Sequence, residues 1–149
     1  MDKTDFEQNL KVHFTAVRYN ISKGDNMIKS IEEDFVKIYI DKNYQERLLY
    51  ELGSSKKRAN ALSRFSHNAE AIMKKSVNKR ILTSLDDFQE KDQTVYIISW
   101  DKNDGITMSL FDAIHYLEAS YMSVILIGED FSLIKEEAEK GCAKILYLR

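Results

Sequence analysis

Apolar residues in the last third of the chain come in three short runs. The runs cover Thr94–Trp100, Ser123–Ile127 and Ala143–Leu148, and few polar residues interrupt them. Nearly continuous apolar runs of this length are typical of β-strands that are covered on both faces. Between the runs, apolar residues recur at helical spacing behind a Thr or Ser that can cap a helix. We therefore expect helices over Thr107–Ala119 and Ser132–Lys140.

The order of these elements predicts an α/β fold. Strands that alternate with helices form a parallel sheet with right-handed crossovers, so we expect a β-α-β-α-β parallel sheet over about residues 94–149. Helices from the earlier part of the chain should pack on this sheet. With 149 residues, the chain has the usual length of one domain. We expect a three-layer-like single domain over 1–149, with an α-rich part (1–92) and a βαβαβ part (93–149).

Helical patterns fill most of the α-rich part. Capping residues followed by apolar residues at helical spacing predict helices, and Gly53 should end one of them in the left-handed conformation. These helices cover Thr4–Asn20, Met27–Asp34, Asn43–Leu52, a basic stretch from Ser54 or Ser55 to about Ser76, and Leu85–Glu90. Phe35–Ile40 is ambiguous, because its alternating apolar residues favour a strand but also fit a helix that continues from Met27.

The composition places the chain among ordinary globular proteins. Hydrophobic residues make up 44% and charged residues 31% of the sequence, which argues against general disorder. Cys142 is the only cysteine, so no internal disulfide can form. The sequence shows no signal-peptide pattern and no apolar stretch near the roughly 20 residues that a membrane helix needs. We therefore expect a cytoplasmic protein without a membrane partner.

Charge is unevenly distributed along the chain, although the net charge is only −2. The segment Lys56–Arg80 contains eight basic residues and one acidic residue, Glu70. Lys and Arg at the start of a helix oppose the helix dipole, and acidic residues that could form pairs along the helix are nearly absent. An excess of positive charge in one segment indicates either an anionic partner or a solvated helix face whose charges meet acidic residues elsewhere in the same protein.

The basic segment therefore supplies the first functional hypothesis, a binding or regulatory module for an anionic partner. On a continuous helix, its Lys, Arg, Asn and His side chains could contact phosphates and base edges, or an acidic protein surface. The candidate partner-binding residues are Lys57, Asn60, Arg64, His67, Asn68, Lys74 and Lys75. We expect Lys57, Arg64 and Lys75 to share one exposed face, since they are spaced by close to whole helical turns. This hypothesis requires no cofactor.

Acidic residues after two of the predicted strands supply an alternative. In an open parallel sheet, ligands bind beyond the carboxyl ends of the strands. The acidic residues at that edge would be Asp101, Asp104, Glu129 and Asp130. Carboxylates are the ligands that Mg²⁺ prefers. The alternative function is a Mg²⁺-dependent enzyme of phosphoryl transfer or phosphoester hydrolysis.

Whether the chain is an enzyme stays open at this level. The sequence contains no glycine-rich phosphate loop, no nucleophile elbow and no zinc motif. A third hypothesis is a protein–protein adaptor without catalytic activity, in which Tyr and Phe side chains anchor the partner. The oligomeric state and the identity of a partner do not follow from the sequence.

Overall fold

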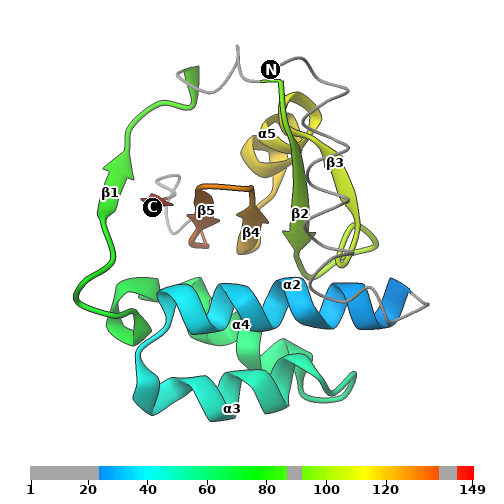
Figure 1. Ribbon diagram of the computed structural model, residues 1–149. Helices are drawn as coiled ribbons and strands as arrows, with labels where there is room; N and C mark the ends of the chain where they lie inside the picture. Colours follow the sequence, from blue (N-terminus) through cyan, green and yellow to red (C-terminus); the bar gives the residue numbers. More distant parts are fainter. Residues whose placement is uncertain (1–23, 87–91, 138–143) are drawn as a thin grey trace.

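The computed structural model describes residues 24–86, 92–137 and 144–149, and combines helices with a six-stranded sheet (Figure 1). The helices are α2 (Gly24–Tyr39), α3 (Lys42–Leu52), α4 (Arg58–Ser66), the short 3₁₀ helix η1 (Ala69–Ile72) and α5 (Leu110–Ala119). The strands are β1 (Lys79–Leu82), β2 (Thr94–Ile98), β3 (Thr107–Ser109), β4 (Val124–Ile127), β5 (Ser132–Lys135) and β6 (Ile145–Leu148). The predicted helix Thr4–Asn20 and most of Leu85–Glu90 lie outside the described residues.

The sheet is antiparallel throughout, so the predicted β-α-β-α-β parallel sheet is wrong. Its strand order is β1-β6-β5-β4-β2-β3, and all five neighbouring pairs run antiparallel. The apolar runs do contain β2, β4 and β6, as predicted. The connection from β4 to β5 explains the difference, because Ile127 pairs with Ser132 and a short turn joins them. Parallel neighbours need a crossover of a dozen or more residues, whereas a turn produces a hairpin.

Gly128 and Phe131 close this turn at short range. The Gly128 N–H donates to the Phe131 carbonyl at 2.8 Å, and a Cβ on Gly128 would lie 2.8 Å from the Phe131 ring. Only glycine therefore fits here without displacing the ring. The close approach favours the hairpin over the predicted helix start at Ser132.

The predicted helix Ser132–Lys140 begins as strand β5, and residues 138–140 lie outside the described residues. The charged residues Lys135 and Glu136 are typical of a helix surface, but both are buried in this structure. The Lys135 Nζ donates to the carbonyls of Leu117 and Ser120, at 2.6 and 2.7 Å, and so caps the end of α5. Distant backbone groups thus satisfy charges that would otherwise be costly to bury.

The helical part differs from the prediction in the extent of two helices. α2 continues through Tyr39, so Phe35–Tyr39 is helical rather than a strand, and only Ile40 lies in an isolated bridge. Ile38, which contributed to the alternating pattern, is 57% exposed. α3 confirms the predicted helix, although Asp41 caps it and Gly53 takes a right-handed conformation. The predicted helix Thr107–Ala119 is confirmed only from Leu110 on, as α5; Thr107–Ser109 form strand β3, and Ser109 rather than Thr107 caps the helix.

The basic segment forms a much shorter helix than expected. α4 ends at Ser66, and η1, a turn and strand β1 follow it. The backbone around η1 is instead tied to the sheet and to α2. Glu136 accepts from the Ala69 N–H at 2.8 Å, and Ile40 forms a bridge with Met73. These contacts take the place of the helical hydrogen bonds that a helix to Ser76 would need.

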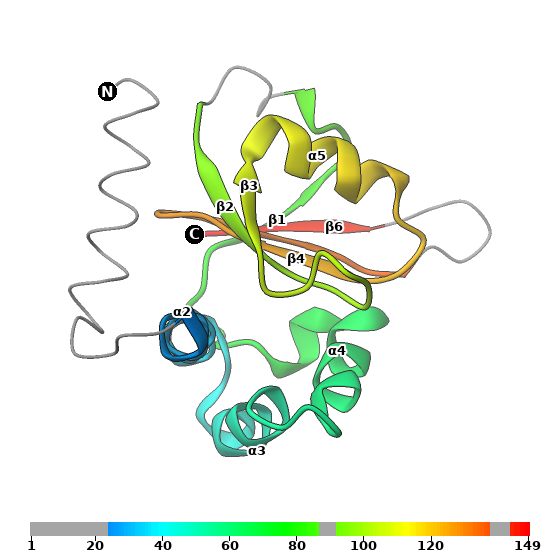
Figure 2. The same ribbon diagram turned by 90° about the vertical axis from the view of Figure 1, so that its right-hand side faces the viewer.

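The sheet separates two apolar cores (Figure 2). On one face, residues of α2, α3, α4 and η1 pack with Tyr96, Ile125, Ile134 and Leu146 of the sheet. On the other face, α5 packs on Val95, Leu126 and Leu133. No helix within the described residues is long and apolar enough to cross a membrane. The layers place the start of α4 beside the β2–β3 connection, where the first candidate site lies.

Candidate functional site

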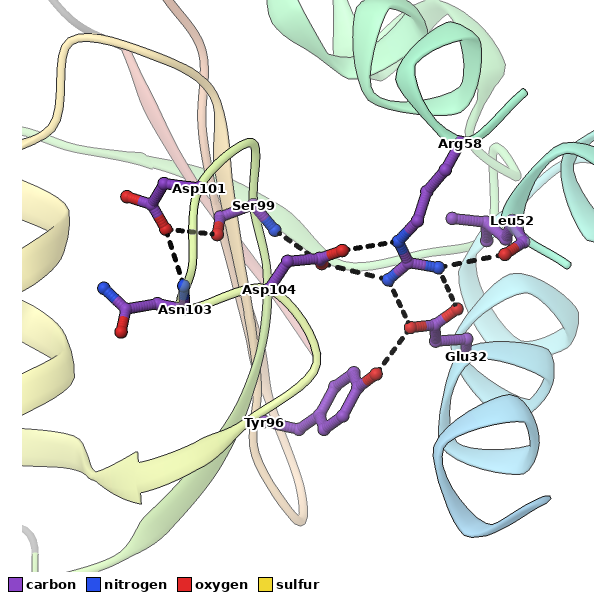
Figure 3. A network of polar contacts seen from close by, with 8 residues as sticks. All are labelled: Glu32, Leu52, Arg58, Tyr96, Ser99, Asp101, Asn103 and Asp104. Carbon is purple, nitrogen blue, oxygen red and sulfur yellow. Dashed lines mark hydrogen bonds and ion pairs between the residues drawn. The ribbon is translucent and has the colours of Figure 1, made fainter. Parts of the chain in front are cut away.

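Arg58, the first residue of α4, joins three parts of the fold through its guanidinium group (Figure 3). The guanidinium donates from Nη1 and Nη2 to the Glu32 carboxylate of α2, at 2.7 and 2.5 Å. It also donates from Nε and Nη2 to Asp104, in the β2–β3 connection, at 2.6 and 3.0 Å. Nη1 adds a bond to the Leu52 carbonyl, at 3.0 Å. These five bonds use all five N–H donors of an arginine.

The environment of Arg58 favours the charged form of its guanidinium. The side chains of Arg58 and Glu32 are 18% and 5% exposed. Burial alone would lower the pKa of Arg58, but the hydrogen bonds and charges of Glu32 and Asp104 outweigh burial and raise it. Tyr96 donates its hydroxyl to Glu32 at 2.5 Å, and burial together with the Glu32 charge raises the Tyr96 pKa. With every donor engaged, Arg58 is a structural bridge rather than a ligand-binding group.

The β2–β3 connection is itself held by side-chain hydrogen bonds. Asp104 accepts from the Ser99 N–H at 3.0 Å, and Asp101 accepts from Ser99 Oγ and the Asn103 N–H, at 3.1 and 2.9 Å. Tyr116 of α5 donates to the other oxygen of Asp101 at 2.7 Å. Against the opposing effect of burial, these bonds lower the pKa of Asp101. Both carboxylates are therefore occupied within the protein.

Arg64 forms a second internal pair, with Glu51 of α3. Its Nε and Nη2 donate to the two oxygens of Glu51, at 2.7 and 2.9 Å. The Arg64 and Glu51 side chains are 27% and 5% exposed. The hydrogen bond from Arg64 lowers the pKa of Glu51, and the same bond raises the pKa of Arg64. This pair fastens α3 to α4.

The structure does not bring the predicted partner-binding residues onto one helix face. Lys57 and Asn60 are exposed at the start of α4, whereas Lys74 and Lys75 follow η1. Arg64 is engaged with Glu51. The helical spacing that placed Lys57, Arg64 and Lys75 together does not apply, because the helix ends at Ser66.

The two remaining candidates lie at the ends of short helices. His67 follows α4 and is largely exposed, with Nε2 at 3.8 Å from Glu137. Asn68 precedes η1 and is also exposed. Along the chain, both residues therefore lie between Arg64 and the lysines that follow η1.

The acidic residues of the alternative magnesium site are not at one edge. Asp101 and Asp104 follow the Ile98 end of β2, while Glu129 and Asp130 follow the Ile127 end of β4. Ile98 pairs with Ile125 and Ile127 pairs with Tyr96, so the two carboxyl ends point in opposite directions. The prediction that these four residues share one edge depended on a parallel sheet and is therefore wrong. In the part of the chain that the structure describes, no three His, Cys, Asp or Glu side chains form a metal-binding group.

A different group of cations lies between the end of α2 and strand β1. We call it the β1 basic surface, and it consists of Lys37, Lys74, Lys75, Lys79 and Arg80; Arg80 lies over the Tyr147 ring, on the other face of β1 from Lys79. The Lys74 Nζ donates to the Lys37 carbonyl at 2.5 Å, and the Lys79 Nζ donates to the Lys74 carbonyl at 3.4 Å. Among the described residues, none of the five forms an ion pair with a carboxylate.

One carboxylate that interacts electrostatically with this surface is Glu70. Its pKa is lowered chiefly by the hydrogen bond from Lys144, with a smaller contribution from Lys79. Lys144 lies 2.7 Å from Glu70 and pairs with it directly. Glu70 is therefore already neutralised by a residue outside the β1 basic surface. Sequence reasoning found Lys74 and Lys75 but missed Lys37, which the fold brings in from α2.

The aromatic anchors of the adaptor hypothesis are partly accessible. Phe111 and Tyr121 are exposed, on α5 and just after it. The Phe111 ring packs against His115, with 4.5 Å between the ring centroids. Exposed aromatic residues of this kind occur singly on many proteins, and these two do not by themselves define a partner.

Replacement of Arg58 should destabilise the fold strongly. We expect Arg58→Met to lower the free energy of unfolding by about 3–5 kcal/mol, because it leaves Glu32 buried without its cation. Arg58→Lys should retain little of the stability, since an ammonium cannot bridge two carboxylates in a bidentate manner. Urea unfolding measures both variants. The neighbouring Lys57→Met is the control, with a change within about 0.5 kcal/mol, and equal costs at the two positions would refute the bridge.

The Arg64–Glu51 pair should make stability depend on pH. Because the folded pKa of Glu51 lies below its ordinary 4.5, the pair stabilises the fold above that pH and loses its contribution as the pH falls through the folded pKa. We expect Arg64→Met to cost about 2–3 kcal/mol at pH 6 and clearly less at pH 3. The control is Arg47→Met, because Arg47 is exposed and lies 3.8 Å from Glu51. A cost of Arg64→Met that stays constant with pH would contradict the assignment.

Known proteins offer no guide to the arrangement of these charges. Comparison of the chain with protein-family models, with curated proteins and with solved structures gave no match. The function must therefore be argued from the described side chains, in which Arg58 and Arg64 pair with carboxylates and the cations of the β1 basic surface do not.

Proposed function

We propose that this chain is a binding module for an anionic partner and that the β1 basic surface makes the contact. The observation that supports the proposal is the lack of ion pairs between its five cations and any described carboxylate. Cations without a paired carboxylate can be neutralised by a bound anion. The partner is a nucleic acid or an acidic segment of a protein.

The backbone under this surface is well fixed, which favours binding. The Lys74 N–H donates to the Tyr39 carbonyl, and the Asp41 N–H donates to the Ile72 carbonyl, both at 2.9 Å. Strand β1 is paired with β6 along its whole length. The cations are thus mounted on ordered backbone, so little backbone entropy remains to be lost when a partner binds.

Lys56 and Lys57 offer a matched comparison on the same chain. Both are exposed and precede α4, whereas Lys75 and Arg80 follow η1. Reversal of either pair changes the net charge by the same amount. An effect of position can therefore be separated from an effect of total charge.

The test is a charge reversal at the β1 basic surface. The double variant Lys75→Glu, Arg80→Glu should lose at least about tenfold in affinity for an anionic probe, since every reversed contact costs about 1 kcal/mol or more. The probes are a labelled 20-nucleotide single-stranded DNA and a polyglutamate peptide, titrated at two salt concentrations by fluorescence anisotropy. Binding of the DNA should weaken with salt, with a slope of about −0.7 per phosphate contact.

The control is the double variant Lys56→Glu, Lys57→Glu. We expect its affinity to stay close to that of the wild-type chain at equal ionic strength. Equal losses in the two double variants would assign binding to overall charge and reject the β1 basic surface. If the wild-type chain binds neither probe at low salt, the proposed function is wrong.

A further inference from the structure

Strand β1 is one edge of the sheet, and half of its backbone hydrogen-bonding groups face outward. Among the residues that the structure describes, β1 pairs only with β6. The Arg149 N–H donates to the Asn78 carbonyl at 3.1 Å, and bonded pairs alternate along an antiparallel ladder. The backbone groups of Arg80 and Leu82 therefore point toward β6 and bond to it, as the Asn78 carbonyl bonds to Arg149. It follows that the N–H and C=O groups of Lys79 and Ile81 point away from the sheet.

The side chains along this edge have mixed chemistry. Lys79 and Ile81 lie on the α2 face, opposite Leu148 and Leu146, while Arg80 and Leu82 lie on the α5 face. Ile81 is 55% exposed. The chain contains no proline, so none blocks this edge. An open strand with an exposed apolar side chain is a template for a further strand.

We propose that β1 accepts an extended acidic segment of a partner protein as a seventh, antiparallel strand. The inference rests on the proposed function and names its partner. In an incoming strand, acidic side chains would oppose Lys79 and Arg80, and apolar ones would oppose Ile81 and Leu82. Cross-strand pairs of this kind stabilise a sheet, whereas like charges opposite one another destabilise it.

Charge also argues against a second copy of this chain as the added strand. If two β1 strands paired antiparallel about a twofold axis at Arg80, the Arg80 side chains of the two copies would lie directly opposite each other. The cations of the β1 basic surface would approach one another without an interposed carboxylate. An acidic partner removes this repulsion and turns it into attraction.

A protein segment fits the edge better than a nucleic acid does. A peptide backbone can satisfy the outward groups of Lys79 and Ile81 at their two-residue spacing, and phosphates lack the alternating donors that this requires. Single-stranded nucleic acids gain affinity by stacking bases on aromatic rings. On the adjacent strand, the Tyr147 ring already stacks with Phe131, with centroids 6.0 Å apart, and lies under Arg80 at 5.1 Å.

The test uses a capped peptide with the central sequence Val-Val-Glu-Glu, which places Glu opposite Arg80 and Lys79. One control peptide carries the sequence Val-Val-Lys-Lys. The second control peptide keeps the acidic sequence and carries N-methyl groups on the amides that face β1. We expect the acidic peptide to bind and the N-methylated peptide to bind at least about tenfold more weakly, since its charge is equal but its donors are lost. Amide exchange at Lys79 and Ile81 should slow at least about tenfold upon binding of the acidic peptide.

Ile81→Pro provides the matching change in the protein. The proline removes one outward N–H and leaves the ladder to β6 intact, as tolerated at sheet edges. We expect at least about a tenfold loss of peptide affinity, whereas Ile81→Val should bind like the wild-type chain. Circular dichroism checks that Ile81→Pro is folded. If it is not, the N-methylated peptide and the exchange measurement decide.

The outcomes separate this inference from the proposed function. Equal binding of the acidic and N-methylated peptides would overturn strand addition and leave an anion-binding surface. Binding of the 20-nucleotide single-stranded DNA without binding of the acidic peptide would likewise overturn it, with a nucleic acid as the partner. Absence of binding to both probes would reject the proposed function as well.

Discussion

The guanidinium of Arg58 is the interaction on which the assembly of helices and sheet depends. It bridges the buried Glu32 of α2 and Asp104 of the β2–β3 connection, and it also holds the end of α3 through the Leu52 carbonyl. Tyr96 brings a strand of the sheet to the same carboxylate. A buried charge is tolerable only when its hydrogen bonds are complete. These hydrogen bonds therefore fix the start of α4 relative to α2, the end of α3 and the β2–β3 connection.

The local parts of this fold could be predicted from the sequence, and its topology could not. The apolar runs that contain β2, β4 and β6 and the periodicity of α3 and α5 are short-range signals, and these elements are present. The direction of the strands depends on whether residues 132–135 form a helix or a strand. Lys135 and Glu136 resemble helix-surface residues, yet backbone groups of α5 and η1 satisfy them. No local pattern contains such partners.

The candidate site shows the same division between local and long-range information. The excess of positive charge between residues 56 and 80 is visible in the sequence. Which of these cations are used internally depends on Glu32 and Asp104, 26 and 46 residues away from Arg58, and on Glu51. The arginines take these positions because a planar guanidinium fits carboxylates in a bidentate manner, while an ammonium remains well hydrated at the surface. Of the predicted partner-binding residues, Lys74 and Lys75 belong to the β1 basic surface, and only the fold brings Lys37 next to them.

Within the described ranges of the chain, the arginines of α4 are bound by internal carboxylates, whereas the cations of the β1 basic surface are not. Labelling of the native chain with phenylglyoxal, which modifies guanidinium groups, tests this claim directly when each site is followed by mass spectrometry. Arg47 is the reference, because its side chain is 71% exposed. The account predicts that Arg80 reacts at a rate close to that of Arg47, and that Arg58 and Arg64 react only when urea unfolds the protein. Modification of Arg58 in the folded chain at the rate of Arg47 would contradict it.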